Sequence, residues 1–150
     1  MLRYFYENEL VTISQEKPEN WEEAVRLSSK NLLEKKIINQ TYVEEVVEAV
    51  KKYGPYIVIV PGVAMPHSTD KSEGVFGTAI SFTKFEEPIY FAEGDEEKQA
   101  RLFFTLAAKN PEEHMENIAA LSDLLMTEGV IEALEKVHSL KEYQQVVEMF

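Results

Sequence analysis

A short apolar run between two prolines constrains the fold of this chain more than any other stretch. Tyr56–Val60 lies between Pro55 and Pro61, and four of its five residues are β-branched. Such a run is typical of a strand that is buried on both faces of a parallel or mixed sheet. We expect this strand to end at Pro61-Gly62 and a tight segment with one ionisable side chain, His67, to follow. Because ligands and chemistry gather beyond the carboxyl ends of strands in open α/β sheets, His67 is placed for chemistry.

The rest of the chain alternates between helix and strand patterns, which predicts an α/β fold. Helices are expected from start and stop signals: one from Asn20, one from the capping box Thr41–Glu44 to Gly54, one from Asn110-Pro111, one over Val130–Val137, and one after Ser139. Further strands are expected at Leu10–Ile13, at Val75–Phe85, at Pro88–Phe91 after a turn at Glu86-Glu87, and at Arg101–Ala108. We predict a single domain over residues 1–150: a three-layer sandwich with a mixed central sheet of about five strands and helices on both faces.

Composition excludes several classes of function. The chain has no cysteine, which excludes disulfides, zinc–cysteine sites and thiol catalysis and indicates an intracellular protein. A formal net charge of −12 argues against nucleic acid and anionic membranes as partners. This charge either steers a basic protein partner or serves solubility alone. No signal peptide is evident, and the longest apolar stretch, Tyr56–Met65, is far shorter than the roughly 20 residues that span a bilayer. We therefore expect a cytoplasmic protein.

Two of the three histidines are candidate functional residues. A neutral imidazole at His67 is a nucleophile near pH 7, and Ser68 and Thr69 carry hydroxyl and N–H groups that suit an anion. His114 falls at the start of a predicted helix, where free N–H groups also favour an anion. The plainer alternatives are a loop histidine without a role and a histidine at the edge of the core. His138 lies in a polar segment and is expected on the surface.

The acidic stretch Glu93–Glu97 is the one candidate for a divalent cation. It lacks the ligand spacing of a calcium loop, and the chain has no glycine-rich nucleotide loop, nucleophile elbow or zinc-protease motif. We expect neither a metal nor a cofactor.

The segments Gly54–Ile59 and Pro61–His67, with the sequences G-P-Y-I-V-I and P-G-V-A-M-P-H, resemble the active-site segment of a known family. They are similar to the IIA components of the bacterial sugar phosphotransferase system, of the mannitol–fructose type. The G-P-Y variant most resembles the ascorbate branch. Weaker matches lie elsewhere in the chain, at Trp21–Val25, at Phe85–Phe91, and at Phe104–Ala108 followed by His114.

The resemblance implies a phosphoryl carrier. His67 would accept a phosphoryl group on Nε2 from the small carrier protein HPr and pass it to a cysteine of a IIB component that serves a membrane IIC permease. His114 would hydrogen-bond the phosphate. Lys51 stands where the mannitol type has an arginine, so it is at most an auxiliary. Asp95–Ala100 departs from the family's D-P-V motif, so no role is assigned to that loop.

Two other functions stay open from the sequence. One is a stand-alone regulatory module that senses phosphorylation and binds other proteins. The other is a metal-dependent hydrolase that uses the acidic stretch. The sequence determines neither the transported solute nor the oligomeric state, a homodimer being one option.

Overall fold

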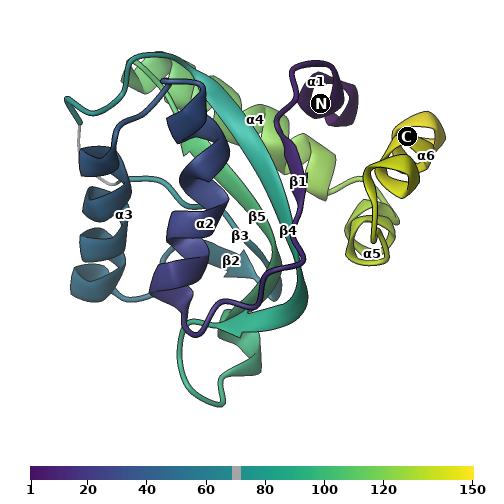
Figure 1. Ribbon diagram of the computed structural model, residues 1–150, viewed down its shortest axis with the longest axis horizontal. Coiled ribbons are helices and arrows are strands. Elements are labelled where there is room, and N and C mark those ends of the chain that lie inside the picture. The colour runs from purple at the N-terminus through teal and green to yellow at the C-terminus, as the bar shows by residue number, and fades with distance from the viewer. Residues whose placement is uncertain (69–71) are drawn as a thin grey trace.

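The computed structural model describes residues 1–68 and 72–150 (Figure 1). Within these residues the strands form one five-stranded mixed sheet in the order β1-β4-β5-β3-β2. The strands are β1 (Val11–Ile13), β2 (Val58–Val60), β3 (Gly62–Ala64), β4 (Ala79–Tyr90) and β5 (Gln99–Ala107). β1 runs parallel to β4 and β3 parallel to β5, whereas the pairs β4–β5 and β2–β3 are antiparallel.

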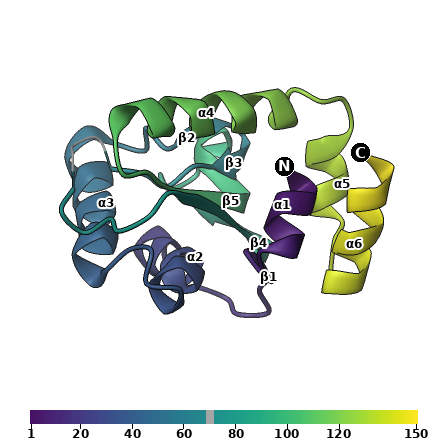
Figure 2. The ribbon, with the colours of Figure 1, turned by 90° about the horizontal axis from the view of Figure 1, so that it is seen from above.

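Helices cover both faces of this sheet. The helices are α1 (Leu2–Glu7), α2 (Trp21–Glu34), α3 (Gln40–Tyr53), α4 (Pro111–Leu125), α5 (Val130–Glu135) and α6 (Leu140–Met149), with a 3₁₀ turn, η1, at Glu96–Lys98. Figure 2 shows α2 and α3 on one side of the sheet and α4 on the other, with α1, α5 and α6 gathered at one end. The predicted mixed sheet of about five strands with helices on both faces is therefore confirmed.

Alternate side chains of β5 build a core on each face of the sheet. The ring of Phe104 lies 5.9 Å from Phe5 of α1, measured between centroids. Phe103 points to the opposite face, where Phe91 lies 5.9 Å away and itself stacks on Trp21 of α2. Because both faces of β5 are buried, its sequence is almost continuously apolar, as predicted for Arg101–Ala108.

Most of the predicted helix ends are confirmed because their signals are local. The side chains of Asn20, Asn110 and Ser139 each accept a hydrogen bond from the backbone N–H three residues later, at 2.8–3.1 Å. Gly54 follows α3 with a φ of +82°, a conformation that favours glycine.

The predicted cap at Thr41 is wrong. Asn39 caps α3, its side chain accepting from Tyr42 N–H at 3.1 Å, so Thr41 lies inside the helix. The carboxylate of Glu44, expected to complete the capping box, instead pairs with Arg26 of α2 at 2.8 Å. Asn is a better N-cap than Thr, so the helix starts at the earlier of two local signals.

The prediction of a strand buried on both faces at Tyr56–Val60 is also wrong. The last three residues of that run form β2 at the edge of the sheet, with Ile59 64% and Val60 40% exposed. The chain then reverses at Gly62, which has a φ of +94°. β3 is the interior strand, and all three of its residues are buried. The prolines and glycine therefore mark a reversal between two short strands rather than the end of a longer one.

The third correction concerns β4. A turn was expected at Glu86-Glu87, between strands at Val75–Phe85 and Pro88–Phe91, but one strand runs through from Ala79 to Tyr90. Its pairing with β5 shifts register between Lys84 and Ile89. The two glutamates therefore lie in an irregular part of the ladder, and the hairpin turn comes later, around η1. The predicted helix at Val130–Val137 ends earlier, at Glu135, and α1 was not predicted.

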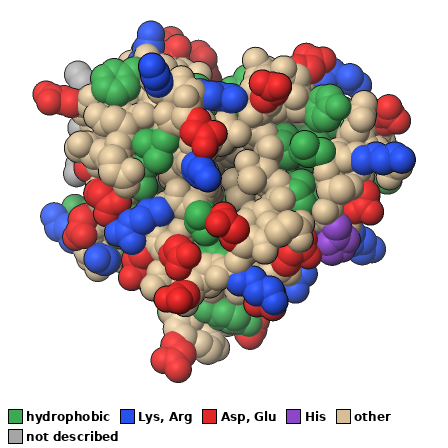
Figure 3. Space-filling view, in the orientation of Figure 1, with side chains coloured by type: hydrophobic (Ala, Val, Ile, Leu, Met, Phe, Trp, Pro, Cys, Tyr) green, Lys and Arg blue, Asp and Glu red, His purple; other side chains and the backbone are tan. Residues whose placement is uncertain are grey.

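Figure 3 shows one face of the molecule in the orientation of Figure 1. Acidic side chains are scattered over it, with Lys and Arg side chains between them and no continuous basic area. This distribution agrees with the net charge of −12 and gives a polyanion no surface to bind on this face.

Candidate functional site

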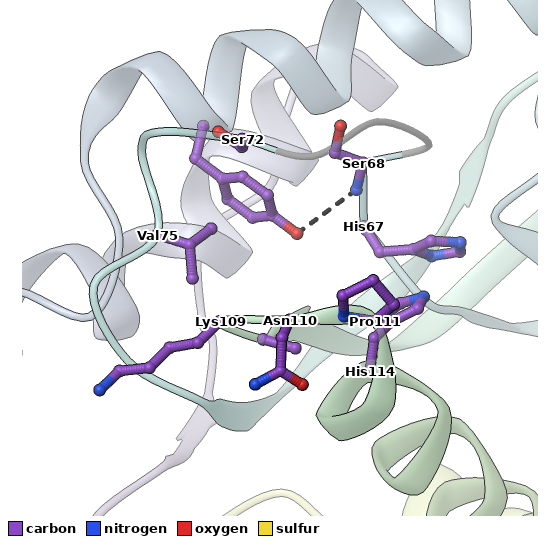
Figure 4. Close-up of a pocket in the computed structure, with 10 residues that line it drawn as sticks. His67, Ser68, Ser72, Val75, Lys109, Asn110, Pro111 and His114 are labelled. Carbon is purple, nitrogen blue, oxygen red and sulfur yellow. Dashed lines mark hydrogen bonds between the residues drawn. The ribbon is translucent and has the colours of Figure 1, made fainter.

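A cavity of about 390 Å³ opens where the segment after β3 passes the start of α4 (Figure 4). Its lining combines both candidate histidines with polar and small side chains: Tyr42, His67, Ser68, Ser72, Val75, Ala108, Lys109, Asn110, Pro111 and His114. These residues come from α3, from the segments after β3 and β5, and from the first turn of α4. The two histidines chosen from the sequence therefore share one cavity.

His67 is held in a defined tautomer. Its Nδ1 lies 2.5 Å from the carbonyl oxygen of Met65. A carbonyl oxygen only accepts hydrogen bonds, so Nδ1 carries the proton and donates. In the neutral ring the lone pair is then on Nε2. This is the nitrogen that the family resemblance implies for phosphoryl transfer.

The surroundings of His67 also favour its neutral form. Burial lowers the pKa of the imidazole, the hydrogen bond to Met65 raises it, and the neighbouring His114 lowers it again. The net effect is a pKa below the usual 6.5. His67 is half-buried rather than fully exposed, and the lowered pKa favours its neutral form near pH 7.

His114 reaches the same cavity from α4. Asn110 caps this helix, Pro111 occupies its first position, and the backbone N–H of His114 bonds to Asn110 C=O at 3.1 Å. The centroids of the two histidine rings lie 5.5 Å apart, and the ring planes are tilted by 41°. One small anion between the rings would contact both, beside a helix N-terminus that favours negative charge.

A polar network fixes the start of α4 to the segment before β4. Thr78 Oγ1 donates to Glu113 Oε2 at 3.0 Å and accepts from Lys109 N–H at 3.1 Å. The Asn110 side-chain amide donates to the same Glu113 oxygen at 3.0 Å. This network holds the first turn of α4, which carries His114, against Thr78.

The backbone of residues 65–68 is held by hydrogen bonds on several sides. Met65 N–H donates to Ile57 C=O at 2.8 Å, and Leu106 N–H donates to Pro66 C=O at 2.9 Å. Tyr56 OH donates to His67 C=O, and Ser68 N–H donates to Tyr42 OH at 3.3 Å (Figure 4, dashed line). The Ser68 N–H that was expected to serve an anion is thus engaged with Tyr42. Thr69, the other residue expected to contact an anion, lies outside the described residues.

Of the two lysines Lys51 and Lys109, only Lys109 lines the cavity. Lys51 is exposed near the end of α3, pairs with Glu48 at 3.5 Å and is not part of the cavity lining. Lys109 lines the cavity, but its ammonium end extends away from the two histidines (Figure 4).

The other candidate residues are engaged elsewhere. His138 is exposed, as expected, and its Nδ1 lies 3.0 Å from Glu86. In the acidic stretch, Asp95 caps η1 and Glu96 accepts from Tyr90 OH at 2.8 Å. Within residues 1–68 and 72–150, no three His, Asp or Glu side chains are grouped so as to hold a metal ion. None of the helices in the same ranges is long and apolar enough to span a membrane.

Sequence reasoning missed the site roles of Tyr42 and Tyr56. Tyr42 lies on the apolar face of α3 among buried valines, where a hydroxyl needs a hydrogen-bonding partner. That need was a usable signal, although the partner itself was not predictable. Tyr56 belongs to the run that was interpreted as a strand, so no contact between its hydroxyl and His67 was expected.

Comparison with known proteins gives consistent results. The family model described as "Phosphoenolpyruvate-dependent sugar phosphotransferase system, EIIA 2" matches residues 5–149. The chain is 33% identical over 144 residues to the mannitol-specific cryptic phosphotransferase enzyme IIA component of Escherichia coli K12, covering 96% of this chain and 95% of that protein. It is 28% identical to the ascorbate-specific PTS system EIIA component of the same strain, over 95% and 90% of the two chains. Among solved structures, the complex of enzyme IIAMTL and phosphorylated enzyme IIBMTL from E. coli matches with a TM-score of 0.76 and 26% identity, over 95% and 96% of the chains.

Proposed function

Because this chain belongs to the EIIA 2 family of the phosphoenolpyruvate-dependent sugar phosphotransferase system, we propose that His67 carries a phosphoryl group between two other proteins of such a system. The donor is the phosphorylated carrier protein HPr. The acceptor is a cysteine of a IIB component, which serves a membrane IIC permease. The relay operates in the cytoplasm.

The proposed chemistry is two successive phosphoryl transfers. In the first, Nε2 of His67 attacks the donor's phosphorus, so one P–N bond forms as the donor's P–N bond breaks. In the second, the cysteine sulfur attacks the same phosphorus, so a P–S bond forms as the P–N bond to His67 breaks, and His67 returns to its neutral state. No oxidation or reduction is involved. Such transfers need in-line placement and neutralised charge more than covalent machinery.

One observation carries the proposal: His67 and His114 line the same cavity, their ring centroids lie 5.5 Å apart, and Nδ1 of His67 is hydrogen-bonded to Met65 C=O. The bond from Nδ1 supports Nε2 as the nucleophile. The nearby second imidazole and the N-terminus of α4 support a role in binding the phosphoryl oxygens.

The test is incubation with phosphorylated HPr that has been purified beforehand, followed by intact-mass spectrometry. One acid-labile phosphoryl group should appear on the protein and be absent from His67→Ala. His138→Ala is a matched control, because this histidine is exposed and outside the cavity. Labelling of His67→Ala at the normal rate would contradict the proposal.

His114 is proposed to hydrogen-bond the phosphoryl group. His114→Ala should still be labelled, but transfer onward should slow by about 10- to 100-fold, which is the loss expected for one hydrogen bond to a charged group. Unchanged transfer kinetics would remove His114 from the site. Label that passes onto a IIB cysteine would favour transport over a purely regulatory role.

A further inference from the structure

We propose that Tyr42 and Tyr56 are positioning residues for His67: their hydroxyls clamp the His67–Ser68 peptide group from both ends and so hold the imidazole in its reactive orientation. The expected effect of the clamp on the rate of phosphoryl transfer rests on the proposed function. Its effect on the orientation of His67 does not, and NMR of the His67 ring tests that effect separately.

The first half of the clamp is Tyr56, which precedes β2. Its hydroxyl donates to the carbonyl oxygen of His67. Its ring also lies edge-on to the imidazole, with centroids 5.3 Å apart and planes at 87°. Tyr56 N–H bonds to Gly54 C=O at 2.8 Å, so the residue is itself held at the end of α3.

The second half is Tyr42 of α3, which is only 5% exposed. Its hydroxyl accepts from Ser68 N–H at 3.3 Å and donates to Leu106 C=O of β5 at 2.6 Å. Burial raises the pKa of Tyr42 well above its ordinary value, so the hydroxyl keeps the proton that this donation requires. Tyr42 therefore ties the segment after His67 to a central strand.

The two contacts act on one rigid unit. The carbonyl of His67 and the N–H of Ser68 belong to the same planar peptide, so two hydroxyls on opposite sides restrict its rotation. Restricting this plane limits the backbone on which the imidazole is mounted. The ring's own bond from Nδ1 to Met65 then completes its orientation.

The clamp acts through His67 rather than on the phosphoryl group. The Tyr42 hydroxyl donates its hydrogen bond to Leu106 C=O, and the Tyr56 hydroxyl donates its hydrogen bond to His67 C=O. Neither proton is directed to a phosphoryl oxygen. A shift of about 1 Å in a reacting group can cost about 100-fold in rate, so a freed peptide would slow transfer without removing any reacting atom.

The experiment compares Tyr42→Phe and Tyr56→Phe with a matched control, Tyr143→Phe. Tyr143 of α6 is also buried and donates its hydroxyl to a backbone carbonyl, that of Leu2, at 2.7 Å, but it does not line the cavity. Each variant is measured in two ways: by the rate of phosphoryl uptake at saturating phosphorylated HPr, and by ¹⁵N NMR of the His67 ring, which reports its tautomer.

Tyr42→Phe and Tyr56→Phe should each slow uptake by about tenfold or more and populate the second His67 tautomer, whereas Tyr143→Phe should do neither. If both variants behave like Tyr143→Phe, the clamp is wrong. Slower uptake with an unchanged His67 spectrum would mean that the hydroxyls act on the phosphoryl group directly, which also overturns a positioning role.

Failure of the proposed function is separable from failure of the clamp. If His67→Ala is still labelled, the phosphoryl relay on His67 is wrong, while the ¹⁵N spectra of the tyrosine variants still decide whether the clamp exists. If Tyr42→Phe does not fold, Tyr56→Phe decides alone, because Tyr56 is partly exposed and packs only at the edge of the core.

Discussion

Replacing Glu86 by Gln should destabilise the fold by about 2–3 kcal/mol, because it leaves the buried ammonium of Lys84 without its ionic partner. The side chain of Lys84 is 1% exposed, and its Nζ lies 3.3 Å from Glu86 Oε1. Removing one member of a buried pair typically costs about 3–5 kcal/mol. The Glu86 side chain is 26% exposed, so water can solvate part of the charge that loses its partner. The expected loss of stability is therefore at or below the lower end of that range.

The assay is urea denaturation at pH 7, followed by circular dichroism. In a chain of this size the loss corresponds to a fall in Tm of about 5–10 °C. Lys84→Met combined with Glu86→Gln should recover most of the stability, because no buried charge then lacks a partner. Glu87→Gln is the matched control: its carboxylate pairs with Lys17 at 3.6 Å on the exposed surface and should matter by less than about 0.5 kcal/mol.

The pH dependence gives a second check. Burial raises the pKa of Glu86, but the hydrogen bonds and charges of Lys84 and His138 outweigh this and leave it below 4.5. The stabilisation is therefore present above pH 4.5 and is lost as the pH falls through the lowered pKa. If Glu86→Gln is as stable as the parent at pH 7, or if the double variant is as unstable as the single one, the reasoning is refuted.

Three further predictions concern the site. The NMR titration midpoint of His67 should lie below 6.5, so both uptake and the His67 contribution to stability persist at pH 6.5 and fall at lower pH; a midpoint at or above 6.5 would contradict the cause assigned to the shift. Asn110→Ala should cost about 1 kcal/mol in urea denaturation and slow onward transfer, since it frees the turn that carries His114, whereas Asn110→Ser should retain most of both. Incubation with EDTA should leave transfer from purified phosphorylated HPr unchanged, and a loss of activity would revive the cation site considered at Glu93–Glu97.

Helix ends and the two candidate histidines were accessible from the sequence because their signals are local. A cap such as Asn110 bonds to an N–H three residues later, so both partners lie within one turn of chain. The segment before His67 is similarly compact, and the Nδ1 partner of His67 is only two residues away. The assignment to the EIIA 2 family, suggested by that segment, is confirmed by the match over residues 5–149.

Strand assignments failed where the outcome depended on distant partners. Tyr56–Val60 was predicted as a strand buried on both faces, but β3, which was not predicted, lies beside β5 and leaves β2 at the edge. The expected turn at Glu86-Glu87 is absent because β4 pairs with β5 on both sides of this stretch, and Glu86 instead contacts Lys84 and His138.

The sequence by itself determined the fold class, the starts of the main helices and the identity of the two candidate histidines, since each depends on residue type and on spacing within a few positions. Only the tertiary structure decided that the histidine rings lie 5.5 Å apart, that Tyr42 and Tyr56 hold the peptide after His67, and that Lys84 is buried beside Glu86. Most of those contacts join residues from different elements of the fold. Their free energy depends on how the helices and strands pack, which no local pattern encodes.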